Sequence, residues 1–104
     1  MTKWYISLLA MLILPVSAFA QTGTVRGTVT DAETGELLPG VNVTIAEVQR
    51  GAATSVEGTY DITGVPAGTY EIAARFVGFR TARATVTVTA GETVEQNFTL
   101  RPEI

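Results

Sequence analysis

From Thr24 to Leu100 the sequence alternates polar and apolar residues in short segments, and turns that contain glycine separate these segments. A period of two is typical of β-strands with one buried face, whereas an amphipathic helix repeats every 3.6 residues or so. No helical period of useful length is found in this stretch. The pattern predicts an all-β domain, and turn signals every 8–12 residues or so favour a small antiparallel sandwich.

Seven strands are predicted, and the segment 70–76 carries the clearest pattern. In that segment one face carries Tyr70, Ile72, Ala74 and Phe76. The other face carries Glu71, Ala73 and Arg75. The threonine-rich outer faces fit β-propensity and contact with water. The predicted strands cover residues 24–30, 41–45, 53–56, 60–62, 70–76, 82–88 and 94–100.

Glycines and prolines mark the predicted chain reversals. Pro39 and Pro66 are expected at strand entries, where a missing N–H costs little. Gly78 is expected to form a bulge or bend, and Asp31 is expected to cap its own turn. The residues assigned to structural turns are Gly35, Pro39, Gly40, Gly58, Pro66, Gly68, Gly78 and Gly91.

The two tyrosines of this stretch, Tyr60 and Tyr70, are interpreted as structural. Each is expected to bury its ring and to donate its hydroxyl to a nearby backbone group. Phe79 differs from them because it follows the break at Gly78. Core packing is the first expectation for Phe79, and a contact role is the second.

The first 20 residues have the layout of a secretory signal peptide. Lys3 precedes an apolar run over residues 4–14, Pro15 breaks the run, and Ala18-Phe19-Ala20 supplies a site for signal peptidase. The run is well short of the ~20 residues that span a bilayer, and the chain has no Cys to carry a lipid. We therefore expect a signal peptide over 1–20, cleavage before Gln21, and one domain over 21–104.

The residue inventory excludes most routes to catalysis. The chain has no His and no Cys, its only Lys is Lys3, and Ser55 is the only Ser after the leader. Nucleophilic hydrolysis needs a base beside its nucleophile, and zinc sites favour His and Cys. Asp31, Asp61 and the glutamates fall at turns or polar faces without a pairing pattern, and no calcium-loop motif is present. The expectation is a protein that is not an enzyme and that has no cofactor and no metal.

The charge of the chain also limits its partners. The net charge is −3, and removal of Lys3 with the leader makes it one unit more negative. A mildly acidic chain without a basic cluster is a poor ligand for nucleic acid or for anionic lipid. No run after the leader is long and apolar enough to form a transmembrane helix.

Several motifs in a fixed order resemble the carboxypeptidase regulatory-like domain. The opening of that domain is matched by Gly27-Thr28-Val29-Thr30-Asp31 followed by Leu38-Pro39-Gly40-Val41-Asn42-Val43. The rest is matched by Glu57-Gly58-Thr59-Tyr60, by Val65-Pro66-Ala67-Gly68-Thr69-Tyr70 and by Phe76-Val77-Gly78-Phe79. The resemblance implies a seven-stranded, transthyretin-like Greek-key sandwich. Transthyretin-like hydrolases of a purine-breakdown product rely on histidines, which this chain lacks.

The resemblance also implies a cellular setting. Such modules accompany metallocarboxypeptidases, and they stand directly after the signal peptide in TonB-dependent, SusC-like outer-membrane transporters. In those transporters a TonB-box-like segment, a plug and a β-barrel follow the module. We therefore expect a protein of the periplasm or outer membrane of a Gram-negative bacterium. Both a fragment of a longer receptor and a free-standing exported module fit the sequence.

Two functions from different classes are compatible with these observations. The first is a protein-interaction module of an outer-membrane importer, which binds through an edge strand or through the Phe76–Arg83 segment. Its candidate contact residues are Phe79, Arg75, Arg80 and Arg83. The second is a carbohydrate-binding module, which is weaker because no Trp follows the leader. An aromatic ring lying flat on the surface would favour sugar, and a bare edge strand would favour protein.

Overall fold

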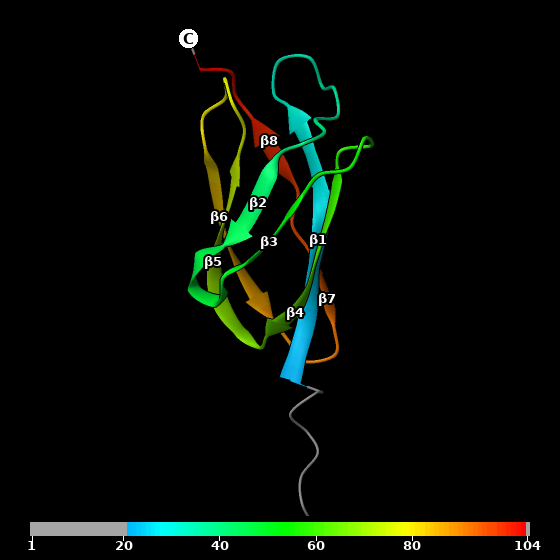
Figure 1. The fold of residues 1–104 in the computed structure, drawn as a ribbon, viewed down its shortest axis with the longest axis vertical. Helices are drawn as coiled ribbons and strands as arrows, with labels where there is room; N and C mark the ends of the chain where they lie inside the picture. Colours follow the sequence, from blue (N-terminus) through cyan, green and yellow to red (C-terminus); the bar gives the residue numbers. More distant parts are fainter. Residues whose placement is uncertain (1–20, 104) are drawn as a thin grey trace, which may run out of the picture.

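The structure is a computed structural model that describes residues 21–103, so the predicted signal peptide lies outside the described residues. Eight strands and one short 3-10 segment, η2 (Ala46–Val48), make up the described part (Figure 1). Among these residues, no helix has the length and apolarity required to cross a membrane. The strands are β1 (Thr22–Asp31), β2 (Asn42–Ile45), β3 (Arg50–Ala53), β4 (Thr59–Pro66), β5 (Gly68–Arg75), β6 (Ala82–Val88), β7 (Thr93–Glu95) and β8 (Phe98–Leu100).

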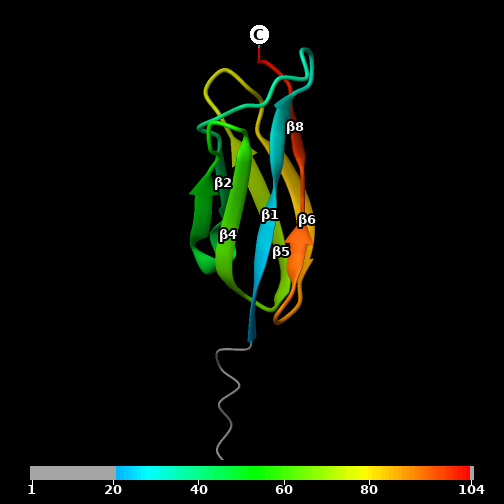
Figure 2. The same ribbon diagram turned by 90° about the vertical axis from the view of Figure 1, so that its right-hand side faces the viewer.

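The strands form two four-stranded sheets that face each other, as the edge-on view in Figure 2 shows. In one sheet β1 is central, β4 lies on one side of it, and β7 and β8 lie on the other. The other sheet has the order β3-β2-β5-β6. The all-β sandwich predicted from the period of two is therefore confirmed.

The predicted count of seven strands and the purely antiparallel pairing are wrong. The expected last strand, 94–100, is divided into β7 and β8, and both pair with β1 in parallel. The strand is divided because, at Asn97, a side-chain oxygen and not a backbone carbonyl accepts a hydrogen bond from β1. The Asn97 Oδ1 accepts a hydrogen bond from the Thr28 backbone N–H at 2.9 Å. The parallel direction follows because the chain crosses to the other sheet after β6 and then runs alongside β1.

Two further predictions need correction. The third strand, expected at 53–56, is β3 at Arg50–Ala53, because Gln49 adopts φ 53° and reverses the chain early. Pro66 does not begin a strand but is the last residue of β4. There it pairs with Thr22 at the outer end of the ladder.

The core lies between the two sheets and consists mostly of residues that the alternation predicted to face inward. Ala73, which was predicted on the outer face with Glu71 and Arg75, is buried as well. Val25 and Val29 of β1 are fully buried, while Arg26 between them is exposed. The buried apolar side chains are Val25, Val29, Leu38, Val41, Val43, Ile45, Tyr60, Ile62, Val65, Ile72, Ala73, Ala74, Val86, Val88, Phe98 and Leu100. Burial of apolar surface stabilises the fold by roughly 25 cal/mol for each Å², and the chain has no disulfide to add to it.

The predicted local contacts of Asp31 and the two tyrosines are confirmed. The Asp31 carboxylate accepts hydrogen bonds from the backbone N–H groups of Glu33 at 2.7 Å and Thr34 at 3.3 Å. The Tyr60 hydroxyl donates to the Gln96 carbonyl, and the Tyr70 hydroxyl donates to the Pro66 carbonyl at 2.9 Å. Tyr60 is buried and Tyr70 is half-buried.

Candidate interaction surfaces

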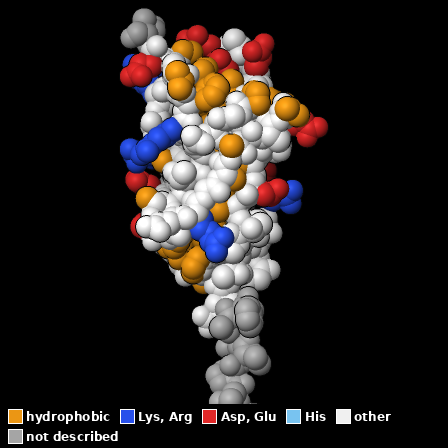
Figure 3. Space-filling view, viewed as in Figure 1, with side chains coloured by type: hydrophobic (Ala, Val, Ile, Leu, Met, Phe, Trp, Pro, Cys, Tyr) orange, Lys and Arg blue, Asp and Glu red, His pale blue; other side chains and the backbone are white. Residues whose placement is uncertain are grey.

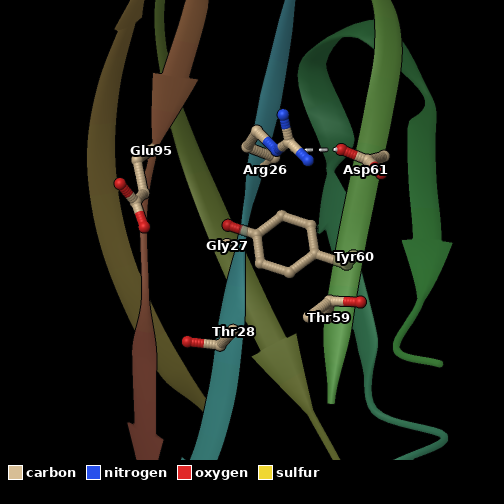
Figure 4. A pocket seen from close by; sticks show the side chains of 7 residues that line it. All are labelled: Arg26, Gly27, Thr28, Thr59, Tyr60, Asp61 and Glu95. Atoms are coloured by element: carbon tan, nitrogen blue, oxygen red, sulfur yellow. Dashed lines mark ion pairs between the residues drawn. The ribbon is translucent and has the colours of Figure 1, made fainter. Parts of the chain in front are cut away.

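A shallow polar hollow of about 430 Å³ lies on the outer face of the sheet that contains β1 (Figure 4). Arg26 of β1 stands between two acidic neighbours, Asp61 of β4 and Glu95 of β7, because these three residues share one cross-strand row. The Arg26 Nε lies 3.4 Å from Asp61 Oδ1, and both side chains are more than half exposed. Exposed pairs of this kind contribute about 0–1 kcal/mol to stability.

The remaining lining of the hollow carries hydroxyl groups and no further charge. These residues are Thr28, Thr59, Tyr60 and Gly27. Burial, with an added effect of the Glu95 carboxylate, raises the pKa of Tyr60 well above its ordinary value. Tyr60 is therefore protonated at neutral pH and serves as a hydrogen-bond donor. Among residues 21–103, no three acidic side chains come close enough together to hold a metal ion.

Gly27 has a packing role that the sequence reading did not identify. A Cβ at this position would lie 2.0 Å from the Gln96 carbonyl oxygen, well inside van der Waals contact. The same carbonyl accepts the Tyr60 hydroxyl, and Tyr60 is the cross-strand partner of Gly27. Absence of a side chain at Gly27 therefore allows the segment between β7 and β8 to approach β1.

The four predicted contact residues lie on or near the β5–β6 connection, and the structure does not gather them into one cluster. Phe79 is half-buried and its ring stacks on Phe76, with centroids 5.7 Å apart. The Arg83 guanidinium pairs with Glu71 at 3.3 Å on the outer face of the sheet. Arg80 is fixed through its backbone N–H, which donates to the Arg101 carbonyl at 2.8 Å. Whether these residues contact a partner stays a prediction.

Arg75 borders a second hollow, of about 330 Å³, at the end of the sandwich where β5 stops. Asn42 and Thr81 supply polar groups to it, and Phe76 and Val77 supply apolar surface. Arg75 and Asn42 are neighbours because they are cross-strand partners on β5 and β2. The hollow therefore combines one cation, two neutral polar side chains and apolar surface.

The exposed apolar side chains at this same end were missed by the sequence reading. Leu37 is 50% exposed, Val56 is 87% exposed and Val77 is 92% exposed. They lie on the β1–β2, β3–β4 and β5–β6 connections, which Figures 1 and 2 show at one end of the sandwich. Apolar side chains gather over this end in Figure 3 as well. We refer to these three connections, 32–41, 54–58 and 76–81, as the three-loop end.

The last described residues are joined to the three-loop end. Phe79 forms an antiparallel bridge with Pro102, and the Glu103 backbone N–H donates to the Gly78 carbonyl at 2.8 Å. These contacts hold residues 101–103 against the β5–β6 connection. The sequence pattern did not reveal this arrangement, because each contact joins two irregular segments.

Comparison with known proteins decides the family. Residues 24–101 match the carboxypeptidase regulatory-like domain. The chain belongs to this family. The resemblance predicted from the motifs is thus confirmed, and the regulatory-like domain covers the sandwich from β1 to the end of β8.

A curated relative of this regulatory-like domain is the TonB-dependent receptor P3 of Formosa agariphila. It is 36% identical over 77 residues, which are 72% of this chain and 8% of the receptor. The chain therefore spans less than a tenth of the length of that relative.

Solved structures share the fold of the regulatory-like domain. A type II cohesin–X–dockerin complex of Acetivibrio cellulolyticus matches with a TM-score of 0.62 and 26% identity, over 73% of this chain and 52% of that one. The 5-hydroxyisourate hydrolase of Klebsiella pneumoniae matches with a TM-score of 0.58 and 19% identity, over 79% of this chain and 92% of the hydrolase. At 19% identity the second likeness concerns the fold alone.

Proposed function

We propose that the chain is a non-catalytic accessory module of the bacterial cell envelope, and that it is the N-terminal extension, or a fragment, of a TonB-dependent outer-membrane transporter. The observation that carries this proposal is the 36% identity to a segment of TonB-dependent receptor P3. The module is exported to the periplasm or outer membrane. Its partner is protein, either the rest of the receptor or another component of the envelope.

The surface of the module supports a protein partner. Exposed apolar side chains on a small domain mark contact sites more often when they gather in one place than when they are scattered. Leu37, Val56 and Val77 gather at the three-loop end, beside the hollow that Arg75 borders. The cohesin–X–dockerin neighbour is itself part of a protein–protein complex.

The surface gives little support to a carbohydrate-binding role. Sugar sites present aromatic rings that lie open to solvent, and in the described residues every Phe and Tyr side chain is buried or half-buried. Titration calorimetry against starch and other oligosaccharides tests this alternative. Heat of binding at millimolar sugar would favour it over the receptor module.

A deletion in the parent receptor tests the proposed function. Removal of residues 21–103 with retention of the leader is expected to impair receptor assembly or substrate uptake. A second variant, Leu37→Thr with Val56→Thr and Val77→Thr, removes the exposed apolar groups and keeps the core. Its matched control replaces the exposed Thr63, Thr89 and Thr99 by Ala.

The deletion and the apolar variant are both expected to reduce uptake, whereas the control is expected to transport normally. Immunoblots of the outer membrane separate a loss of receptor from a loss of transport. Unchanged receptor level and unchanged uptake in the deletion strain would contradict the accessory role.

A further inference from the structure

Three of the four sheet edges carry features that prevent pairing with another chain. Strand β3 has only four residues. The guanidinium of its Arg50 lies against Gly64 of β4, so close that a Cβ added at Gly64 would be 3.2 Å from the guanidinium carbon. Strand β4 has a register shift opposite β1 and ends at Pro66. The edge formed by β7 and β8 is interrupted where the Asn97 side chain enters the ladder. Short strands, inward-pointing charges, bulges and prolines are the usual means by which proteins protect sheet edges.

The fourth edge, β6, has none of these features. It is seven residues long, it pairs with β5 without a register shift, and it contains neither Gly nor Pro. Its one charged residue, Arg83, lies near its start and is already paired with Glu71. From Ala84 to Val88 it consists of Ala, Thr and Val only, and β-branched residues of this kind favour strand pairing.

The backbone of β6 presents hydrogen-bonding groups to the open side. The Glu71 N–H points away from β6, because it donates to the Glu47 carboxylate at 3.2 Å. In an antiparallel ladder the bonded and non-bonded pairs alternate, so Thr85, the partner of Glu71, directs its own N–H and C=O outward. By the same alternation Arg83 and Thr87 also direct their backbone groups outward. No described residue pairs with these groups.

We propose that β6 is a strand-addition site and that its occupant is β6 of a second copy of this chain, which joins the two β3-β2-β5-β6 sheets into one continuous sheet. The proposal does not depend on the role in a receptor. Full overlap of two antiparallel β6 strands places Thr85 opposite Thr85 of the second copy. The outward groups of Arg83, Thr85 and Thr87 then all find partners.

The side chains of β6 are complementary to themselves in this register. On the inner face the half-buried Ala82 and Ala84 meet Val88 and Val86 of the second copy, so that small residues face larger ones. On the outer face Arg83 meets Thr87 of the second copy. The two Arg83 side chains lie at opposite ends of the overlap, so no like charges face each other. A partner strand with a charge opposite Thr85 would lack this fit.

The chain offers a direct test, because it contains no cysteine. Thr85→Cys places one thiol on each copy at the centre of the overlap, with Cα atoms about 5.5 Å apart, a separation that a disulfide can bridge. Thr87→Cys is the register control. Its two thiols are offset by four residues, about 14 Å along the strand. Thr63→Cys, an exposed residue of β4 on the other sheet, reports random collisions.

Under mild oxidation of the purified chain, Thr85→Cys is expected to form disulfide-linked dimers at least about tenfold more than either control. Sedimentation equilibrium of the unmodified chain is expected to show a weak dimer that is half formed at about 0.1 mM. Weak association is expected because a single pair of strands buries an area at the small end of the range for protein–protein interfaces. Thr85→Lys brings two like charges together and is expected to weaken the dimer about tenfold. Thr63→Lys, which adds the same charge elsewhere, is expected to leave it unchanged.

A monomer at all concentrations up to about 1 mM, with equal cross-linking in the three cysteine variants, would overturn the proposal. A dimer that Thr85→Lys does not weaken would also overturn it, because the copies would then meet at another surface. A monomer whose β6 amides gain protection from hydrogen exchange only on addition of a foreign strand-forming peptide would replace the second copy by a different occupant.

Discussion

Gly27 and Tyr60 act together, and their contacts determine how closely the last part of the chain approaches β1. Gly27 leaves space for the Gln96 carbonyl, and Tyr60 donates its hydroxyl to that same carbonyl. The ring of Tyr60 also packs near Phe98, with centroids 6.4 Å apart. Gly27 and Tyr60 are among the residues that line the polar hollow of Figure 4, and their contacts hold the segment between β7 and β8 against β1.

Gly27→Ala is expected to destabilise the fold by about 3 kcal/mol, because its Cβ meets a backbone oxygen that cannot rotate away. The comparison is Gly91→Ala, where φ is +76° but the space is open. That change is expected to cost only about 1–2 kcal/mol, the strain of the left-handed conformation. Urea unfolding measures both, and a smaller loss for Gly27→Ala would contradict the packing role.

Tyr60→Phe is expected to lower the free energy of unfolding by about 1–3 kcal/mol, because it leaves the Gln96 carbonyl without its donor inside the fold. Tyr70→Phe is the matched control, since its hydroxyl bonds to an exposed carbonyl of Pro66 that water can satisfy. We expect the control to unfold within about 0.5 kcal/mol of the unmodified chain. Equal losses in the two variants would show that the Tyr60 hydrogen bond stabilises the fold no more than the exposed Tyr70 hydrogen bond does.

The raised pKa of Tyr60 predicts a loss of stability in alkali. The folded state holds the phenolic proton to a higher pH than the unfolded chain does, in which the pKa of Tyr is about 10. Stability is therefore fully present below pH 10 or so and falls as the pH rises further. Urea unfolding between about pH 8 and pH 11 is expected to show this fall, and Tyr60→Phe is expected to reduce it. An identical pH profile for the variant would contradict the assignment.

At the scale of elements, Thr54 joins the end of β3 to the connection between β1 and β2. Its buried hydroxyl donates to the Leu38 carbonyl at 2.6 Å and accepts from the Val41 N–H at 2.9 Å. Every buried side-chain polar atom in the described residues has a partner. A single side chain therefore fixes the connection from which the exposed Leu37 projects.

Thr54→Val keeps the shape of the side chain but leaves two buried backbone groups unsatisfied. We expect it to reduce the free energy of unfolding by about 2–4 kcal/mol. Thr54→Ser keeps the hydroxyl and is expected to cost about 1 kcal/mol or less through loss of a methyl group. Thermal or urea unfolding distinguishes them, and a Val variant as stable as the Ser variant would contradict this role.

The strand faces could be predicted from the sequence, but strand pairing could not. The alternation around Val25 and Val29 is a local property, and the structure confirms it. The parallel pairing of β7 and β8 with β1 depends on a contact between Asn97 and Thr28, which are 69 residues apart in the sequence. The position of β3 depends on the left-handed Gln49, a residue type that gives no turn signal.

At the scale of the whole molecule, the sandwich has two different ends. One carries the exposed Leu37, Val56 and Val77, and residues 101–103 pair with the connection there. The sequence motifs predicted the family, because Gly and Pro at fixed spacings reflect turns that the fold requires. They did not predict the three-loop end, since three apolar residues far apart in sequence come to the same end of the molecule only in the folded chain.

Export of the chain is a prediction that lies outside the described residues. If residues 1–20 are a signal peptide, the mature protein begins at Gln21. Intact-mass measurement of the chain recovered from the periplasm of a bacterial host is expected to match residues 21–104. Replacement of Ala18 and Ala20 by larger residues is expected to block processing. A mass that includes the first 20 residues would contradict the assignment.

The proposed function makes this regulatory-like domain an accessory part of a TonB-dependent transporter. The most direct test is to determine the coding sequence downstream of the Ile104 codon in the source genome. We expect an in-frame continuation into a TonB-box-like segment, a plug and barrel strands. A stop codon directly after Ile104 would contradict it and would make the chain an independent exported module.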